Sequence, residues 1–224
     1  MAGIKGFIFD LDGVLIDTSE FHYRAWKRLA DEEGIPFTRA DNEALRGVSR
    51  RESLNRLLKG RPISEAQAQA WMERKNAYYR DFIKQITPEH LLLGAADFLA
   101  GARALGIRLA VGSASRNAKD VLRGLGILGL FDAIGDGYSV ARTKPAPDLF
   151  IWVAGRLDLP PAECAVFEDA EAGVEAALTA GAVAVGIGPV ERVGRAHVTL
   201  PNGLGDTTAE ALLKRLEEGQ VKAD

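Results

Sequence analysis

Short, almost wholly apolar runs recur along the 224-residue chain, at residues 4–9 (IKGFIF), 107–112 (IRLAVG), 164–167 (CAVF) and 182–187 (AVAVGI). Runs of this length without polar alternation are typical of parallel strands that are covered on both faces. A weaker run, AHVTL, covers 196–200. Helical patterns lie between the runs, at 94–105, 116–125, 147–157, 171–180 and 207–218. This alternation predicts an α/β fold with a Rossmann-like parallel sheet.

A long segment without any strand-like run separates the first two apolar runs. Residues 17–86 are rich in helix formers, and Asp17 with Glu20 resembles a capping box that starts the first helix. That helix is expected to end before GIP at 34–36, and further helices are expected at 39–46, 50–58 and 64–86. We therefore predict a helical cap domain at 16–87, inserted after the first strand, and a core domain made of 1–15 and 88–224. The C-terminal EEGQVKAD is expected to fray.

The composition excludes several classes of function. Charged residues make up 26% of the chain and the net charge is -3, whereas a nucleic-acid-binding domain is normally basic. No apolar run approaches the roughly 20 residues that a membrane helix needs. The single cysteine, Cys164, rules out an internal disulfide and fits a reducing compartment. We expect a cytoplasmic, monomeric protein that acts on a small molecule and binds neither nucleic acid nor a membrane.

Two carboxylates stand where the first strand is predicted to end, which is where open α/β sheets bind their ligands. Asp10 and Asp12 are two residues apart, so on a strand they point the same way. Their charges repel each other unless a cation lies between them. Mg²⁺ takes oxygen ligands and leaves room for phosphate. The alternative is that these aspartates only cap the turn that begins at Gly13.

Polar residues also follow the second run and precede the helix expected at 147–157. Ser113 and Ser115 open a helix, where hydroxyls and free N–H groups suit an anion; plain N-capping is the alternative. Lys144 precedes Pro145, which disfavours helix at the lysine. A lysine fixed there can offset the charge of a phosphate, and a solvated loop lysine is the alternative.

Acids follow the CAVF run as well. Glu168 and Asp169 stand at its end and could complete a metal site with Asp10; helix capping by Asp169 is the alternative. Each alternative is reasonable for one motif taken singly. Together, carboxylates, hydroxyls, a lysine and further carboxylates at successive strand ends indicate one site for a metal ion and a phosphate.

The stretches FDLDGVLIDT, SASRN, KPAPD and FEDAEAG resemble the four motifs of the haloacid dehalogenase superfamily. Because Asp12 is present, the resemblance implies phosphoryl transfer, with Asp10 as the nucleophile and Asp12 as the general acid and base. It implies Mg²⁺ held by Asp10, the main-chain carbonyl of Asp12, Asp169 and Glu168. It also implies that Ser113 and Lys144 bind the transferring phosphoryl group.

The predicted cap carries three arginines within six positions, Arg46, Arg50 and Arg51. Arginine suits bidentate phosphate binding, so this loop could hold a second phosphate; a solvated helix face is the alternative. DTSEFHYRAW, LRGVSRRESL and ERKNAYY resemble the cap of the β-phosphoglucomutase family. Arg46 and Arg116 stand where lysine is usual in that family, and Ala170 stands where serine is typical.

This second resemblance implies that Arg50, Ser115 and Asn117 contact a distal phosphate. It implies that Thr18 is catalytic and that His22 positions Asp12 by a hydrogen bond to it or to its hinge when the cap closes, although a lone histidine is often only structural. For Lys75 the alternative is a solvent-facing place on a long helix. The full substrate-binding set implied is Arg46, Gly47, Val48, Ser49, Arg50, Ser53, Lys75, Ser113, Ala114, Ser115, Arg116 and Asn117.

The activity expected from this resemblance is interconversion of β-D-glucose 1-phosphate and glucose 6-phosphate. Mg²⁺ would be the cofactor, and β-glucose 1,6-bisphosphate would serve as primer and intermediate. One alternative is a Mg²⁺-dependent sugar-phosphate phosphatase on the same scaffold. Another is a sugar-phosphate sensor without turnover, which the intact set of Asp10, Asp12, Lys144 and Asp169 disfavours.

Overall fold

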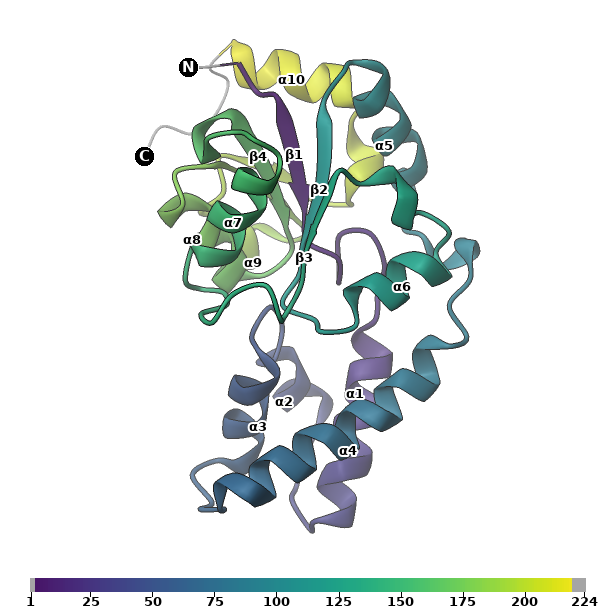
Figure 1. Ribbon diagram of the computed structural model, residues 1–224, viewed down its shortest axis with the longest axis vertical. Helices are drawn as coiled ribbons and strands as arrows, with labels where there is room; N and C mark the ends of the chain where they lie inside the picture. Colours follow the sequence, from purple (N-terminus) through teal and green to yellow (C-terminus); the bar gives the residue numbers. More distant parts are fainter. Residues whose placement is uncertain (1–2, 219–224) are drawn as a thin grey trace.

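A computed structural model describes residues 3–218 and shows a six-stranded sheet in the order β3-β2-β1-β4-β5-β6 (Figure 1). Every neighbouring pair is parallel. The strands are β1 (Gly6–Phe9), β2 (Arg108–Gly112), β3 (Ala133–Gly135), β4 (Cys164–Glu168), β5 (Val183–Ile187) and β6 (Val198–Leu200). The predicted α/β class with a parallel sheet is therefore confirmed. The last six residues of the expected frayed tail lie outside the described residues.

Helices cover both faces of the sheet. They are α5 (Ala95–Ala104), α6 (Ala118–Gly124), α7 (Asp148–Arg156), α8 (Glu171–Thr179), α9 (Val190–Val193) and α10 (Ala209–Glu217), with 3₁₀ turns η1 (Pro88–His90), η2 (Leu128–Leu130), η3 (Pro161–Glu163) and η4 (Leu204–Asp206). Figure 1 shows α7, α8 and α9 on one side of the sheet and α5 and α10 on the other. Two short elements, β3 and α9, have no counterpart among the predicted elements. The three residues of β3 lie between Asp132 and Asp136 and do not form an apolar run like those of the other strands. Helix α9 has only four residues, too few to show a helical period.

Strand β1 illustrates how the sheet divides its side chains between the two faces. Phe7 and Phe9 point to the same side and join the cluster that includes α5 and α10. Ile8 points to the opposite side and packs in the cluster that includes α7 and α8. The alternation explains why the run is apolar throughout, since both faces are covered.

The inserted segment between β1 and α5 forms four helices, as predicted: α1 (Ser19–Glu32), α2 (Arg39–Glu43), α3 (Arg50–Leu58) and α4 (Glu65–Ile83). Local capping explains two of the starts, because Ser49 and Ser64 accept the N–H groups of Glu52 and Gln67. Trp26, Leu54 and Trp71 belong to an apolar cluster that lies within the insert. The ends of α1 and α4 nearest the sheet, with Ala25 and Tyr79, pack in the sheet's own cluster.

Two predictions for the insert are wrong in detail. The capping box of Asp17 and Glu20 does not form, because Asp17 accepts the N–H of Ser19 while Glu20 pairs with Arg39. The helix expected at 39–46 ends at Glu43. The chain turns after it, and Gly47 has a positive φ of 70°.

The two connections between insert and sheet run side by side. Ile16 forms a bridge with Leu91, and the N–H of Leu92 donates to the carbonyl of Leu15 at 2.9 Å. The insert is therefore joined to the sheet through two adjacent, paired segments. No helix within residues 3–218 is both long enough and apolar enough to cross a membrane.

The aromatic cluster against β1 gives a test of the core. Phe98 on α5 stacks on Phe7 at a centroid distance of 5.7 Å and meets Phe167 edge-on at 5.4 Å. Phe98→Ala should lower the free energy of unfolding by about 3–5 kcal/mol, because it removes a buried ring and leaves a cavity. For a chain of this size the melting temperature should fall by roughly 6–20 °C.

The control is Leu105→Ala at the end of the same helix, where Leu105 is 46% exposed. This change should alter stability by no more than about 0.5 kcal/mol. If calorimetry gave equal changes in melting temperature for Phe98→Ala and Leu105→Ala, the packing of Phe98 described above would be contradicted.

Candidate active site

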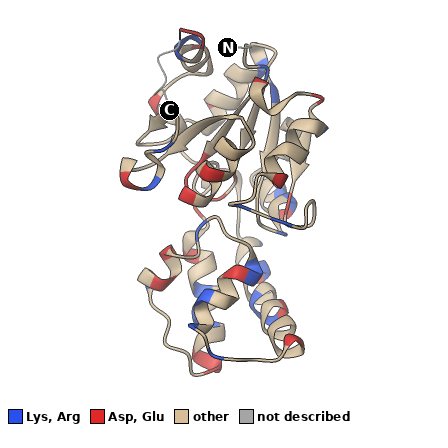
Figure 2. Ribbon diagram, turned by 90° about the vertical axis from the view of Figure 1, so that its left-hand side faces the viewer, with Lys and Arg blue, Asp and Glu red and all other residues tan. Residues whose placement is uncertain are grey.

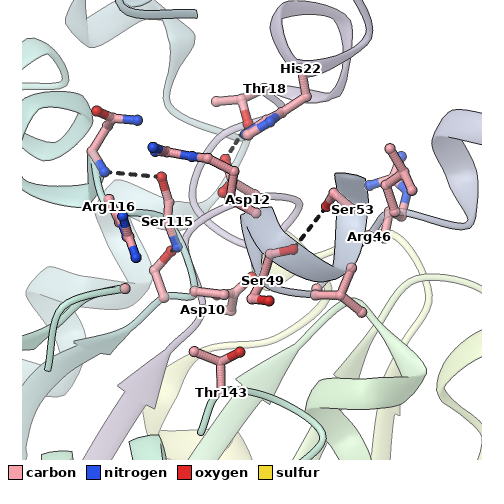
Figure 3. Close-up of a pocket in the computed structure, with 18 of the residues that line it drawn as sticks. Asp10, Asp12, Thr18, His22, Arg46, Ser49, Ser53, Ser115, Arg116 and Thr143 are labelled. Carbon is pink, nitrogen blue, oxygen red and sulfur yellow. Dashed lines mark hydrogen bonds between the residues drawn. The ribbon is translucent and has the colours of Figure 1, made fainter. Parts of the chain in front are cut away.

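A cavity of about 460 Å³ lies between the carboxyl end of the sheet and the insert, and both contribute to its lining. Arg116 and Ser115 lie on one side of Asp12, Arg46 on the other, and Thr18 and His22 come from the insert (Figure 3). The sequence-predicted residues that line it are Asp10, Asp12, Thr18, His22, Arg46, Gly47, Val48, Ser49, Arg50, Ser53, Lys75, Ser113, Ala114, Ser115, Arg116, Asn117 and Asp169. Lys144 and Glu168 are not part of the lining and are both buried.

Three carboxylates converge where β1 and β4 lie side by side. Asp10 follows β1, Glu168 ends β4 and Asp169 comes next, and one oxygen of each lies within 4.8 Å of the others. This is the point where the strand order reverses, since β2 and β3 lie on one side of β1 and β4 to β6 on the other. The helix-capping alternative for Asp169 is wrong, because the N-cap of α8 is Ala170 and it carries no side-chain cap.

Lys144 supplies the positive charge beneath the carboxylates. Its Nζ donates to Asp10 Oδ1 at 2.7 Å and pairs with Glu168, and its side chain has no exposed surface. Burial lowers the pKa of Lys144, but the Asp10 and Glu168 carboxylates raise it by more, so the lysine stays protonated. The alternative of a solvated loop lysine is therefore wrong.

The carboxylate cluster still holds more negative charge than Lys144 compensates. Burial and the charge of Asp10 raise the pKa of Asp169 to about 6, and burial raises that of Glu168 as well. A divalent cation would relieve this repulsion, and a set of buried oxygen donors suits Mg²⁺. Asp10, Glu168 and Asp169 fit this ion. Gly13 makes the approach possible, because with its φ of 86° a Cβ there would lie 2.2 Å from Asp169 Oδ2.

Asp12 stands beside this cluster with a different electrostatic environment. Burial and the charge of Asp10 raise its pKa to about 7, so at neutral pH it holds a proton in part of the molecules. The hydroxyl of Thr18 donates a hydrogen bond to Asp12 Oδ1 (Figure 3). The expected contact of His22 with Asp12 is not among the hydrogen bonds of this structure, where Thr18 is the partner and His22 pairs elsewhere.

His22 contacts Lys75, with its Nδ1 3.0 Å from Lys75 Nζ. Lys75 is 3% exposed, and the rings of Trp26 and Tyr79 lie within 4.9 Å of its Nζ. Burial and the charge of Arg50 lower the pKa of Lys75 well below its usual value, and burial and Lys75 do the same for His22. The solvent-facing alternative for Lys75 is therefore wrong.

A second polar site lies in the same cavity. Arg50 Nη2 donates to Asn76 Oδ1 at 2.8 Å, and Asn117 Nδ2 donates to the same oxygen at 2.9 Å, which joins the insert to the core. Among residues 3–218, neither Arg50 nor Arg116 forms an ion pair with a carboxylate. Burial and the charge of Arg116 lower the pKa of Arg50 to about 10. A largely buried arginine with a second arginine nearby and no carboxylate partner favours the binding of an anion.

The arginine cluster of the sequence does not act as one group. Arg46 pairs with Glu43 and also reaches Oδ2 of Asp169, a member of the carboxylate cluster, at 3.1 Å. Arg51 pairs with Glu65 on the surface. Figure 2 shows both basic and acidic segments on the inserted helices, and acidic segments at the sheet end that faces them. Only Arg50 of the three belongs to the second polar site.

The match to known families agrees with this geometry. A family model described as haloacid dehalogenase-like hydrolase matches residues 4–181, which is well over half of the chain. The chain belongs to this family.

Two relatives of this haloacid dehalogenase-like protein are similar over nearly its whole length. A β-phosphoglucomutase of Bacillus subtilis strain 168 is 41% identical over 223 residues, 98% of each chain. A solved β-phosphoglucomutase from Clostridium difficile superposes with a TM-score of 0.92 at 36% identity, covering 96% of this chain and 98% of the other. A phosphorylated carbohydrates phosphatase of Thermotoga maritima is 30% identical over 178 residues, covering 80% and 82%.

Some residues at the site were not predicted from the sequence. Asn42, Tyr138 and Thr143 line the cavity, and Asn76, outside the lining, bridges Arg50 and Asn117. For α4 a signal was available, because its buried positions 68, 71, 75, 79 and 83 follow a helical period. That period places Lys75 on the inward face and Asn76 next to it. The loop with Tyr138 follows β3, the strand that was not predicted.

The buried lysine of this haloacid dehalogenase-like protein gives a pH-dependent prediction. Between the lowered pKa of folded Lys75 and its usual value of 10.5, the unfolded chain binds more protons than the folded one. Stability should therefore rise with pH across that window. Lys75→Met removes the free-energy cost of burying the lysine, so the variant should melt at a higher temperature than the parent at pH 7. The difference in melting temperature should shrink as the pH approaches 10.

The matched control is Lys84→Met at the exposed end of the same helix, which should leave this pH dependence as in the parent. Thermal melts from pH 6 to 10 measure both variants. A Lys75→Met protein that melts below the parent at pH 7 would show that the charged lysine stabilises the fold.

Proposed function

We propose that this haloacid dehalogenase-like protein is a β-phosphoglucomutase that interconverts β-D-glucose 1-phosphate and glucose 6-phosphate. The observation that carries the proposal is that one cavity joins the carboxylates of Asp10 and Asp12 to a second polar site with Arg50 and Arg116. A sugar bisphosphate needs such a pair of sites, one for each phosphate. Near full-length similarity to β-phosphoglucomutases supports the same activity.

In the first transfer, a carboxylate oxygen of Asp10 attacks the phosphorus of the sugar bisphosphate. An O–P bond to Asp10 forms while the O–P bond to the sugar breaks, and Asp12 gives its proton to the leaving sugar oxygen. A pKa of about 7 suits Asp12 to this role and to its reversal. Bound Mg²⁺ would supply charge neutralisation for the phosphoryl group and its nucleophile.

In the second transfer, the sugar hydroxyl attacks the phosphorus of the aspartyl phosphate. Asp12, now a carboxylate, takes the hydroxyl proton, and Asp10 leaves as a free carboxylate. The net reaction moves phosphate between the 1 and 6 oxygens, with β-glucose 1,6-bisphosphate as intermediate and primer. The bisphosphate formed in this second transfer has to turn over in the cavity before Asp10 attacks its other phosphate.

The residues around the reacting groups would orient and neutralise them. Lys144, 2.7 Å from Asp10, would orient the nucleophile and offset phosphoryl charge. Ser113, which accepts the N–H of Ser115, would hold a phosphoryl oxygen. Thr18 would orient Asp12 through its hydrogen bond. Glu168, Asp169 and the carbonyl of Asp12 would complete the Mg²⁺ ligands with Asp10.

The remaining cavity residues would bind the sugar and its other phosphate. Arg50, Ser115, Arg116 and Asn117 would hold the distal phosphate. We propose that the insert at 16–87 moves as a cap that closes over the substrate and excludes water, which would otherwise hydrolyse the aspartyl phosphate. Arg46, Gly47, Val48, Ser49, Ser53, Lys75 and Ala114 would line the sugar side or set cap closure.

A sugar-phosphate phosphatase is the second candidate, since the phosphatase of Thermotoga maritima is 30% identical to this chain. It would need the same carboxylates and Mg²⁺. It would not need the second polar site, which therefore favours the mutase.

Phosphorus NMR tests the proposal directly. β-Glucose 1-phosphate with Mg²⁺ and a trace of the bisphosphate should convert to glucose 6-phosphate, with inorganic phosphate accumulating more slowly. Removal of Mg²⁺ with EDTA should stop the conversion. Asp10→Asn should reduce turnover by about 10⁴-fold or more, because the nucleophile is lost. Faster release of phosphate than of glucose 6-phosphate would identify a phosphatase, and ligand binding without either product would identify a sensor.

A substitution of Arg50 distinguishes the distal phosphate site from the site of phosphoryl transfer. Arg50→Ala should lower kcat/KM for the mutase reaction by about 10²-fold, because a charged bidentate contact to the distal phosphate is lost. Phosphorylation of Asp10 by acetyl phosphate should fall far less, since this donor has no second phosphate.

The matched control is Arg51→Ala, which removes the neighbouring arginine that pairs with Glu65 at the surface. If Arg50→Ala catalysed the mutase reaction at the parental rate, Arg50 would not be part of the distal phosphate site.

A further inference from the structure

An aromatic side chain stands at the rim of the cavity without being packed into the protein. Tyr138 follows β3, lines the cavity and leaves 70% of its surface exposed. The guanidinium carbon of Arg116 lies 4.9 Å from the centroid of its ring. This is within the distance at which an aromatic face attracts a cation. The ring is therefore in contact with one of the two arginines of the second polar site.

The backbone of the Tyr138 loop is held in place by its own hydrogen bonds. The buried carboxylate of Asp136 accepts the N–H of Tyr138 at 2.9 Å. The hydroxyl of Ser139 accepts the N–H of Asp136 at 3.0 Å, and the N–H of Ser139 donates back to the carbonyl of Asp136. Such a closed turn fixes the direction in which Tyr138 leaves the chain.

This loop is pressed against the loop that carries Arg116. The N–H of Gly137 donates to the carbonyl of Ser115 at 3.2 Å. A Cβ at Gly137 would lie 2.6 Å from the carbonyl oxygen of Ala114 and 2.8 Å from Cγ of Arg116, so only glycine allows this approach. The positions of Tyr138 and Arg116 are thus tied together through their backbones.

Arg116 has few other means of holding its side chain. Among the described residues it forms no ion pair, and the nearby charge of Arg50 repels it. An arginine with free rotamers loses entropy when it binds an anion. A fixed ring face beneath the guanidinium reduces that loss, because the cation is already confined before the ligand arrives.

We propose that Tyr138 is a positioning residue that holds Arg116 in place to bind the distal phosphate of the bisphosphate. The proposal rests on the proposed mutase function, which supplies a ligand with a second phosphate. Tyr138 acts through Arg116 and does not touch the reacting atoms. Its effect is therefore on binding of the bisphosphate and of the sugar monophosphates rather than on the transfer itself.

The direct test measures bisphosphate binding by calorimetry in the Asp10→Asn background, where no turnover interferes. Adding Tyr138→Ala should weaken binding about two- to fivefold, the range that one exposed cation–π contact supplies. Tyr138→Phe keeps the ring and should restore parental affinity, whereas Tyr138→Leu keeps the bulk without the ring face and should not. Equal affinity in the Ala variant and the parent would overturn the proposal.

A double-mutant cycle tests whether the effect passes through Arg116. In an Arg116→Met background, Tyr138→Ala should add no further loss, because the cation that the ring holds is already absent. A full additional two- to fivefold loss would mean that Tyr138 contacts the ligand independently, and would overturn the positioning role. In the active protein the KM should rise while kcat changes less.

The control is Trp152 on α7, an exposed aromatic with Arg156 over its ring at 5.9 Å and outside the cavity lining. Trp152→Ala should leave bisphosphate affinity at the parental value. If the parent hydrolyses β-glucose 1-phosphate instead of isomerising it, the mutase proposal fails by its own NMR test. The binding measurements on Tyr138 still give their answer in that case.

Discussion

Charge balance at the carboxyl ends of β1 and β4 is the constraint on which the arrangement of this protein depends. Asp10, Glu168 and Asp169 lie buried within 4.8 Å of one another, where uncompensated charge is costly. Lys144 reaches two of these carboxylates from a loop more than 130 residues from Asp10, and Arg46 reaches the third from the insert. The strand order brings these distant segments together, so the sheet topology is itself a condition for the chemistry.

The insert and the sheet both contribute charged groups to one cavity. The sheet and its loops bring the carboxylates and Arg116, and the insert brings Arg46, Arg50 and Lys75. Asn76 then accepts a hydrogen bond from each part, one from Arg50 and one from Asn117. This shared asparagine links the insert to the core beside the cavity that the two parts form.

The sequence predicted those elements best that have a clear local pattern of residues. The α/β sheet was predicted from apolar runs that alternate with helical patterns, and the inserted helices from helix formers and end signals; both are confirmed. Strand β3 was missed because its three residues lie between Asp132 and Asp136, and the loop with Tyr138 was missed along with it. The carboxylates and Lys144 were found by their position at strand ends. The pairing of His22 with Lys75 was not, since it depends on the packing of α1 against α4.

The apolar cluster of the insert, with Trp26, Leu54 and Trp71, contains no residue of the sheet. The same helices, α1 and α4, also carry Ala25 and Tyr79, which pack in the sheet's own cluster. Each of these two helices therefore belongs to two cores at once. A substitution in the insert that shifts either helix is felt by the strands that carry Asp10 and Asp169.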